Sequence, residues 1–324
     1  MGTEPPATWK EAFLASPGPR STREAAVLSL KGLCMGSADV IPGVSGGTIA
    51  LITGIYERLI LAIRSIDGEA VKRLVLLDPK GALARVHVRF LLPLFFGIAL
   101  AVVSLARLMN YLLHHHPVET WSLFFGLIAA SIIVVGRRVT GWIGYAGLSF
   151  AAGALAATVI VNLIPVATPE DLWFIFLSGV VAICAMILPG ISGAFVLLIL
   201  GKYEFITGTL KSPFVPENLL VILVFCGGCA AGLAGFSRVL NYLLRRFHNL
   251  TLALLTGLMA GSMQKIWPWK EALETRLIGG EPRVLRTRNL MPQGLDMELL
   301  TAVSLAVAGF VLVMVIERLS REKT

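Results

Sequence analysis

Long apolar runs separated by short charged segments dominate the chain. An α-helix needs about 20 apolar residues to cross a bilayer, and six of the runs come close to that length. They are residues 91–113, 119–136, 141–163, 219–244, 250–267 and 299–316. Two further apolar regions, 25–60 and 172–210, are interrupted by proline and glycine. The pattern therefore predicts an all-α integral membrane protein with six straight spans and two broken segments.

The two interruptions share one motif. Residues 40–57 read VIPGVSGGTIALITGIYE, residues 187–204 read ILPGISGAFVLLILGKYE, and 9 of the 18 aligned positions are identical. Proline cannot donate a backbone hydrogen bond, and glycine lowers helix stability. A Pro-Gly-x-Ser-Gly sequence that occurs twice therefore indicates a specific turn. Each broken region could form two crossing helices or two half-helices in a re-entrant hairpin.

A second similarity extends the repeat. SLARLMNYLL at 104–113 aligns with GFSRVLNYLL at 235–244, which places Arg107 opposite Arg238. Each half then comprises a broken hairpin followed by three spans, and because three is odd, the second half is upside down. This inverted-topology repeat is a common architecture of secondary transporters. We expect one membrane domain made of a polar N-terminal segment (1–22), a first repeat (23–165) and a second repeat (166–324).

Composition and charge agree with a membrane protein. The chain is 56% apolar and 15% charged, whereas a soluble domain carries about 25% charged residues. The net charge of +8 lies in loops beside apolar runs, which is typical of cytoplasmic flanks and not of a nucleic-acid surface. Residues 58–89 contain seven Lys or Arg, which places them in the cytoplasm. The polar start of the chain predicts a cytoplasmic N-terminus, and alternation of the spans then places the C-terminus there too. Residues 265–298 are then outside, although they contain six Lys or Arg.

A turn deep in a bilayer leaves backbone amides without helical partners. Such amides must be buried in protein or line a wet cavity, and a helix N-terminus attracts anions. We therefore expect an anion to bind at the two turns, with two arginines beside them. The expected residues are Pro42, Gly43, Ser45, Gly46, Gly47, Thr48, Pro189, Gly190, Ser192, Gly193, Arg107 and Arg238. The alternatives are close helix crossings at the glycines and arginines that extend to the lipid headgroups.

Four further charged residues are candidates for ion pairing or proton coupling. Glu57 and Glu204 end the two motifs after a tyrosine, and an interfacial helix cap is the alternative role for them. Asp39 and Lys31 have no equivalent in the second half, so any role they have is asymmetric. We predict no metal and no cofactor. The cysteines do not change this prediction, because a cysteine often acts as a small hydrophobe in helix packing. We assign Cys226 and Cys229 that packing role.

The motif sequences resemble one known family. GSADVIPGVSGGTIALITGIYERLI and PGISGAFVLLILGKYE are similar to the PopT-type polyprenyl-phosphate transporters, over roughly residues 22–318. The resemblance implies a protein of the bacterial cytoplasmic (inner) membrane that returns undecaprenyl phosphate, the lipid carrier of wall synthesis, from the outer to the inner leaflet. It also implies that Pro42–Gly47 and Pro189–Gly193 form turns at the middle of the membrane. The expected partners are a polyprenyl phosphate and the bilayer, and a homo-oligomer is possible.

Two other functions fit parts of the pattern. A membrane-embedded phosphatase for the polyprenyl diphosphate would need a nucleophile or base beside cationic phosphate-binding groups. No Arg or His follows Ser45 or Ser192 in the motifs, and none of the five His lies near them. A small-anion transporter or channel would use the helix ends equally well. The sequence favours a transporter for a lipid phosphate over an enzyme.

Overall fold

The computed structural model describes residues 8–39, 45–164, 166, 168–278, 281–292, 294 and 296–321. The motif residues Pro42 and Gly43 lie outside this described part of the chain. The first half contains α1 (Trp9–Ala15), α2 (Thr22–Asp39), α3 (Gly46–Ile52), α4 (Tyr56–Arg64), α5 (Gly68–Val75), α6 (Pro79–Arg85), α7 (Val88–His115), α8 (Pro117–Gly136), the irregular turn η1 (Trp142–Ala146) and α9 (Gly147–Val161). The second half contains α10 (Leu172–Ile187), α11 (Gly193–Ile199), α12 (Tyr203–Lys211), α13 (Pro216–Arg246), α14 (His248–Ser262), η2 (Met263–Ile266), β1 (Lys270–Ile278), β2 (Glu281–Asn289) and α15 (Met297–Arg321).

The structure is a helical membrane protein, as predicted. Among the described residues, five segments are long and apolar enough to cross a membrane, or up to seven if each bent helix pair counts as one span. The five segments are α7, α8, η1 with α9, α13 and α15, and they match five of the six predicted spans. The sixth, predicted over 250–267, was too long. Helix α14 has 15 residues and ends at Ser262, so it is shorter than a straight span requires.

Each broken region contains three helices, where the sequence predicted two, either crossing helices or half-helices of a hairpin. After the motif, α3 bends into α4 by 116°, and α11 bends into α12 by 113°. Gly54 (φ +71°) and Gly201 (φ +64°) lie at these bends. Glycine adopts this left-handed conformation without the steric cost of a Cβ atom, which is why it commonly ends helices. The glycine that follows each short helix therefore supplies the extra bend.

The first broken segment returns to the end of the molecule at which it begins. Ser21, which precedes α2, lines the same pocket as Ile55 and Arg58 at the start of α4. The guanidinium of Arg58 also lies 5.0 Å from the ring centroid of Phe90, at the start of α7. This path is that of a hairpin.

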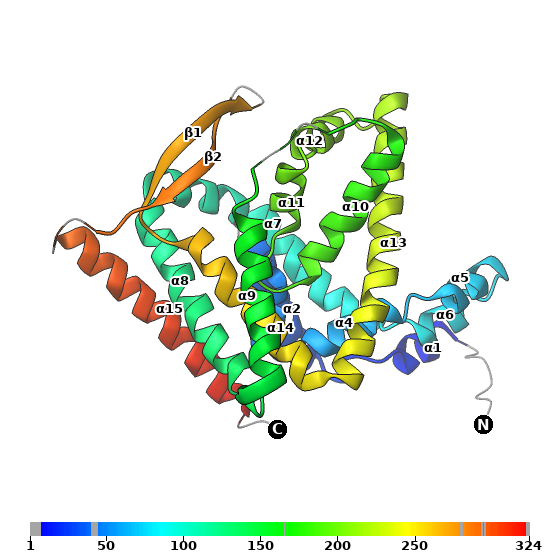
Figure 1. Cartoon of the computed structure of the whole chain (residues 1–324). Helices are drawn as coiled ribbons and strands as arrows, with labels where there is room; N and C mark the ends of the chain where they lie inside the picture. The colour runs from blue at the N-terminus through cyan, green and yellow to red at the C-terminus, as the bar shows by residue number, and fades with distance from the viewer. Residues whose placement is uncertain are drawn as a thin grey trace.

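The second broken segment follows the same path. Lys202 Nζ donates to the carbonyl of Thr168, ahead of α10, at 2.8 Å, and the backbone N–H of Val166 donates to Ile199 O at 3.0 Å. Figure 1 shows α4 near α1 and α6 at the lower end, and α12 with β1 and β2 at the upper end. The two hairpins therefore return to opposite ends of the molecule.

Four helix pairs dominate the packing of the described residues: α2 with α7, α10 with α13, α8 with α15, and α9 with α14. If α5 and α6 of the basic loop are left out, the helices α2, α3, α4, α7, α8 and α9 can be matched in order with α10–α15. The first pair then corresponds to the second, and the third to the fourth. Each pair has a glycine at its closest approach. A Cβ atom added to Gly97, Gly228, Gly126 or Gly257 would lie between 1.8 and 2.1 Å from a carbonyl oxygen of the partner helix. Small residues let helix backbones pack this closely in a membrane.

Replacing Gly126 with valine is expected to separate α8 from α15. The new Cβ would lie 1.8 Å from Ala306 O, and overpacking of this kind costs about 1–3 kcal/mol. Thermal unfolding of the purified protein in detergent should show a lower midpoint. Gly235→Val is the matched control, because no atom lies within 4 Å of the Cβ position there. Equal midpoints for Gly126→Val and the wild type would contradict this packing.

The sequence analysis missed the β-hairpin. Strands β1 and β2 pair antiparallel at the end of the molecule where α12 lies (Figure 1). Lys270 at the start of β1 contacts α8, because its Nζ lies 3.8 Å from the ring centroid of Trp121. Gly279 and Gly280 separate the two strands in the sequence, and a two-residue Gly-Gly connection is a recognised hairpin signal.

Candidate functional site

The two motifs contact each other in the folded chain. Thr48 Oγ1 accepts a hydrogen bond from the backbone N–H of Gly190 at 3.1 Å. Ser45 Oγ donates to Leu188 O at 3.1 Å, and Tyr56 OH donates to Ile187 O at 3.1 Å. Ser45, Thr48 and Tyr56 are each no more than 2% exposed. Side chains of the first motif thus hold the backbone of the second motif at the centre of the protein.

The amides at the start of α3 have partners within the protein. Gly46 N–H donates to Asp39 Oδ1 at 2.7 Å, Gly47 N–H donates to Ser45 Oγ at 3.2 Å, and Thr48 N–H donates to Ser45 O. Asp39 is the last residue of α2, and negative side chains are favourable at a helix N-terminus. Its carboxylate occupies the position at which the sequence predicted an external anion. The absence of a side chain at Gly46 permits this contact, because a Cβ there would lie 2.4 Å from Asp39 Oδ2.

The second turn is built differently from the first. Pro189, Gly190, Ser192 and Gly193 are all buried, and Gly190 has φ +88°. A Cβ on Gly190 would lie 3.0 Å from Leu258 O, so α14 packs directly on this turn. Ser192 precedes α11 without a side-chain capping bond, whereas Ser45 caps α3. The two turns are therefore related in sequence but unequal in hydrogen bonding.

Arg107 lies on α7 and Arg238 on α13, the helices that pack against α2 and α10. The side chain of Arg107 lies outside the described residues. Arg238 Nη1 donates to Ala234 O of its own helix at 2.6 Å. Its side chain lines a pocket of about 410 Å³ together with Arg64, Asn241, Tyr242, Arg245 and Arg246. None of these residues belongs to either motif, so the structure places Arg238 with the end of α4 rather than at the turns.

The other predicted charged residues lie at helix ends. Glu57 Oε1 is 3.8 Å from His248 Nδ1, at the start of α14, and Glu204 lies exposed in the first turn of α12. Lys31 Nζ donates to Thr53 O at 2.8 Å, at the C-terminal end of α3. A positive side chain is favourable at that end of a helix. Lys31 thus holds the end of α3 opposite to the motif turn.

Sequence reasoning missed Lys202. Its side chain is 1% exposed, and its Nζ donates to Thr168 O at the equivalent bend of the second hairpin. Its position in the sequence, inside an apolar segment and directly before the repeated Tyr-Glu pair, indicates a buried lysine with a structural role. Cys229 has the packing role that we predicted, because its Sγ lies 3.5 Å from Gly179 O of α10. Across the described residues, no group of three or more His, Cys, Asp or Glu could hold a metal ion.

Comparison with known proteins identifies the family. Residues 35–280 match the model of a family described as undecaprenyl phosphate translocase-like. A polyprenyl-phosphate transporter of Vibrio cholerae is 45% identical over 264 residues, which cover 81% of this chain and 84% of the relative. A polyprenyl-phosphate transporter of Staphylococcus aureus is 32% identical over 257 residues, or 74% of this chain and 85% of the relative. No solved structure matches the chain. The protein is a multi-pass bacterial membrane transporter rather than an enzyme, and it belongs to the undecaprenyl phosphate translocase-like family.

Proposed function

We propose that the protein returns undecaprenyl phosphate from the outer to the inner leaflet of the bacterial cytoplasmic membrane. The phosphate head binds at the joined motif turns, while the polyprenyl tail remains in lipid. The observation that carries this proposal is the direct bond between Thr48 and Gly190, which brings the two motifs into one site. The names of the two relatives support the choice of lipid.

Asp39 gives the site a resident anion. A phosphate that approaches the amide of Gly46 meets the Asp39 carboxylate already bonded there at 2.7 Å. Two like charges in one site disfavour each other, and a carboxylic acid responds by taking up a proton. Asp39 therefore moves aside or is protonated when the lipid head enters. This exchange would couple transport to protons, and it does not depend on the dipole of a helix as short as α3, which has seven residues.

Alternating access follows from an inverted arrangement of residues 23–165 and 166–324. The similar bends of 116° and 113°, the matching helix pairs and the hairpins at opposite ends (Figure 1) support this arrangement. In inverted-repeat transporters, one repeat rocks against the other around a fixed central site. We assign the end with α1, α4 and α6, and both termini, to the cytoplasm because it carries the basic loop 58–89. The end with β1, β2 and α12 then faces outward.

Reconstitution in vesicles tests this function. Vesicles that contain a fluorescent prenyl monophosphate are exposed to an external phosphatase, which cleaves only headgroups in the outer leaflet. Protein-free vesicles should lose about the outer-leaflet share, and vesicles with the transporter should lose nearly all of the label. Cleavage limited to the outer-leaflet share in both samples would overturn the proposal. Passage of inorganic phosphate without the lipid would instead favour a small-anion transporter.

Thr48→Val is expected to slow this transport about tenfold. The substitution keeps the shape of the side chain but leaves the Gly190 N–H buried without its acceptor, which costs about 1–3 kcal/mol. The matched control is Thr207→Val, because Thr207 Oγ1 bonds only carbonyls of its own helix, those of Tyr203 and Glu204. Initial rates in the vesicle assay measure both. If Thr48→Val transports as fast as Thr207→Val, the contact between the motifs does not support transport.

A further inference from the structure

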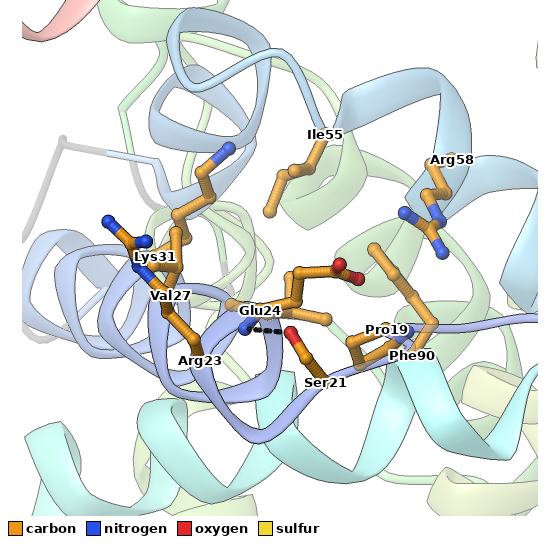
Figure 2. A pocket seen from close by; sticks show the side chains of 10 residues that line it. Pro19, Ser21, Arg23, Glu24, Val27, Lys31, Ile55, Arg58 and Phe90 are labelled. Carbon is orange, nitrogen blue, oxygen red and sulfur yellow. Dashed lines mark hydrogen bonds between the residues drawn. The ribbon is translucent and has the colours of Figure 1, made fainter. Parts of the chain in front are cut away.

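A pocket separate from the motif turns lies where α2, α4 and α7 begin. Its volume is about 490 Å³, within the range of about 300–1,000 Å³ usual for small-molecule sites. Arg23 and Lys31 come from α2 and Arg58 from α4. Figure 2 shows Arg23 and Lys31 on one side of the pocket and Arg58 on the other, with the carboxylate of Glu24 between them.

The pocket has a positive balance of charge. Three cationic side chains face one acid, and Glu24 Oε2 already accepts a hydrogen bond from the backbone N–H of Arg20 at 2.8 Å. Burial, and then the positive charge of Arg58, lower the pKa of the neighbouring His87, which disfavours a positive charge on that imidazole. A phosphate monoester carries a charge of about −1.5 to −2 at neutral pH. It would balance the remaining charge of the pocket.

Apolar side chains form the rest of the lining. Phe90 is 0% exposed and Ile55 is 7% exposed, and Val27 and Leu28 of α2 complete this wall. The Arg58 guanidinium lies over the Phe90 ring, which holds it at the border between the charged and the apolar side. A ligand that matches both sides has an anionic head and a hydrocarbon chain. Free phosphate would use only the cations.

Helix α3 separates the pocket from the first motif turn. Lys31 lines the pocket and also bonds Thr53 O at the end of α3, and α3 starts at the first motif turn. Seven helical residues span about 10 Å. The pocket thus lies between the central site and the end of the molecule that we assign to the cytoplasm.

We propose that this pocket is a second binding site, which receives the head of a prenyl monophosphate at the cytoplasmic leaflet. This proposal rests on the proposed function, because it makes the pocket the release site of the transported lipid. Arg58 and Lys31 contact the phosphate oxygens, a pairing for which arginine is well suited. The first isoprene units lie against Val27, Leu28 and Phe90.

Native mass spectrometry of the full chain with geranylgeranyl monophosphate tests the pocket. We expect the wild type to bind a second lipid that Arg58→Gln loses, with affinity at this site reduced about 10- to 100-fold. Val27→Glu should have the same effect, because it adds a negative charge to the lining of the pocket. Val27 is 44% exposed, so the fold should tolerate this substitution. Arg64→Gln is the matched control on the same helix and lines the other pocket. Its binding should equal that of the wild type.

The outcomes separate this site from the central one. Thr48→Val should weaken lipid binding at the central site. It should leave lipid binding at the pocket, which Arg58→Gln removes, unchanged. If Arg58→Gln and Val27→Glu bind as many lipids as the wild type, the pocket is not a lipid site, whatever the vesicle assay shows. Equal competition by inorganic phosphate would also overturn the proposal, because it would mean that the apolar wall contributes nothing. Failure of transport in the vesicle assay, with this binding retained, would overturn the proposed function and not the pocket.

Discussion

Replacing Asp39 with asparagine is expected to tighten the binding of prenyl monophosphate about tenfold and to remove the response of transport to a proton gradient. Asparagine keeps an oxygen that can accept from Gly46 N–H, now bonded to Asp39 at 2.7 Å, so the turn keeps its shape. It lacks the negative charge that competes with a phosphate. A neutral amide oxygen accepts a weaker hydrogen bond from Gly46 N–H than a carboxylate does. The phosphate of the lipid therefore displaces the asparagine side chain more easily than the aspartate, and the bound lipid leaves more slowly.

The sign of the proton effect follows from the same contact. If Asp39 takes up a proton as the phosphate enters from outside, an acidic outer side accelerates transport by the wild type. The Asp39→Asn variant has no group to protonate at this position, and its rate should be the same with and without the gradient. Binding is best measured in an Arg58→Gln background, in which the central site is isolated. Transport is measured in vesicles with an imposed pH gradient.

Asp78→Asn is the control for this prediction. Asp78 Oδ1 accepts from Gly81 N–H at 2.8 Å at the start of α6, which is the same aspartate-to-glycine geometry outside the motif. This variant should bind and transport like the wild type. Weaker lipid binding in Asp39→Asn, or a gradient response that persists in it, would show that Asp39 supports the fold of the turn and does not compete with the lipid.

The sequence predicted the features of the fold that follow from hydropathy and from the repeated motif. Five of the spans follow from apolar length alone, and the two interrupted segments follow from Pro-Gly-x-Ser-Gly occurring twice. The length of α14 did not follow, because apolar residues such as Ile266 and Trp267 continue the run after the helix ends at Ser262. The bends at Gly54 and Gly201 were present as signals. A single glycine in an apolar run does not by itself distinguish a bend from a continuous helix.

The hydrogen-bond partners at the site could not be read from the sequence. The motif indicated that amides lose helical partners at the turn, but not that Asp39 lies close enough to bond one of them. The partner of Thr48 lies 142 residues away, and only the packing of the two halves brings it there. The side-chain direction of Arg238 likewise depends on which face of α13 meets α4. Repeat equivalence gives the position of a residue on a helix but not its neighbours.

Gly190→Ala is expected to destabilise the protein by about 2–5 kcal/mol, which is enough to prevent accumulation of folded transporter in the membrane. Two separate costs add at this position. The φ of +88° is a left-handed conformation that costs a residue with a Cβ atom about 1–2 kcal/mol. The new methyl group would also lie 3.0 Å from Leu258 O and from Met259 Cα, and 2.9 Å from Ser262 Oγ, and overpacking adds about 1–3 kcal/mol.

Two further variants separate these costs. Gly54→Ala carries only the conformational cost, because Gly54 has φ +71° and no atom within 4 Å of its Cβ position. Its loss should be the smaller one. Adding Ser262→Gly to Gly190→Ala removes one of the three close contacts, while both backbone contacts from α14 remain. Thermal unfolding in detergent should therefore show partial recovery. If Gly190→Ala is no less stable than Gly54→Ala, then α14 yields to the new side chain, and the second turn is not held rigidly enough to position the first motif against it.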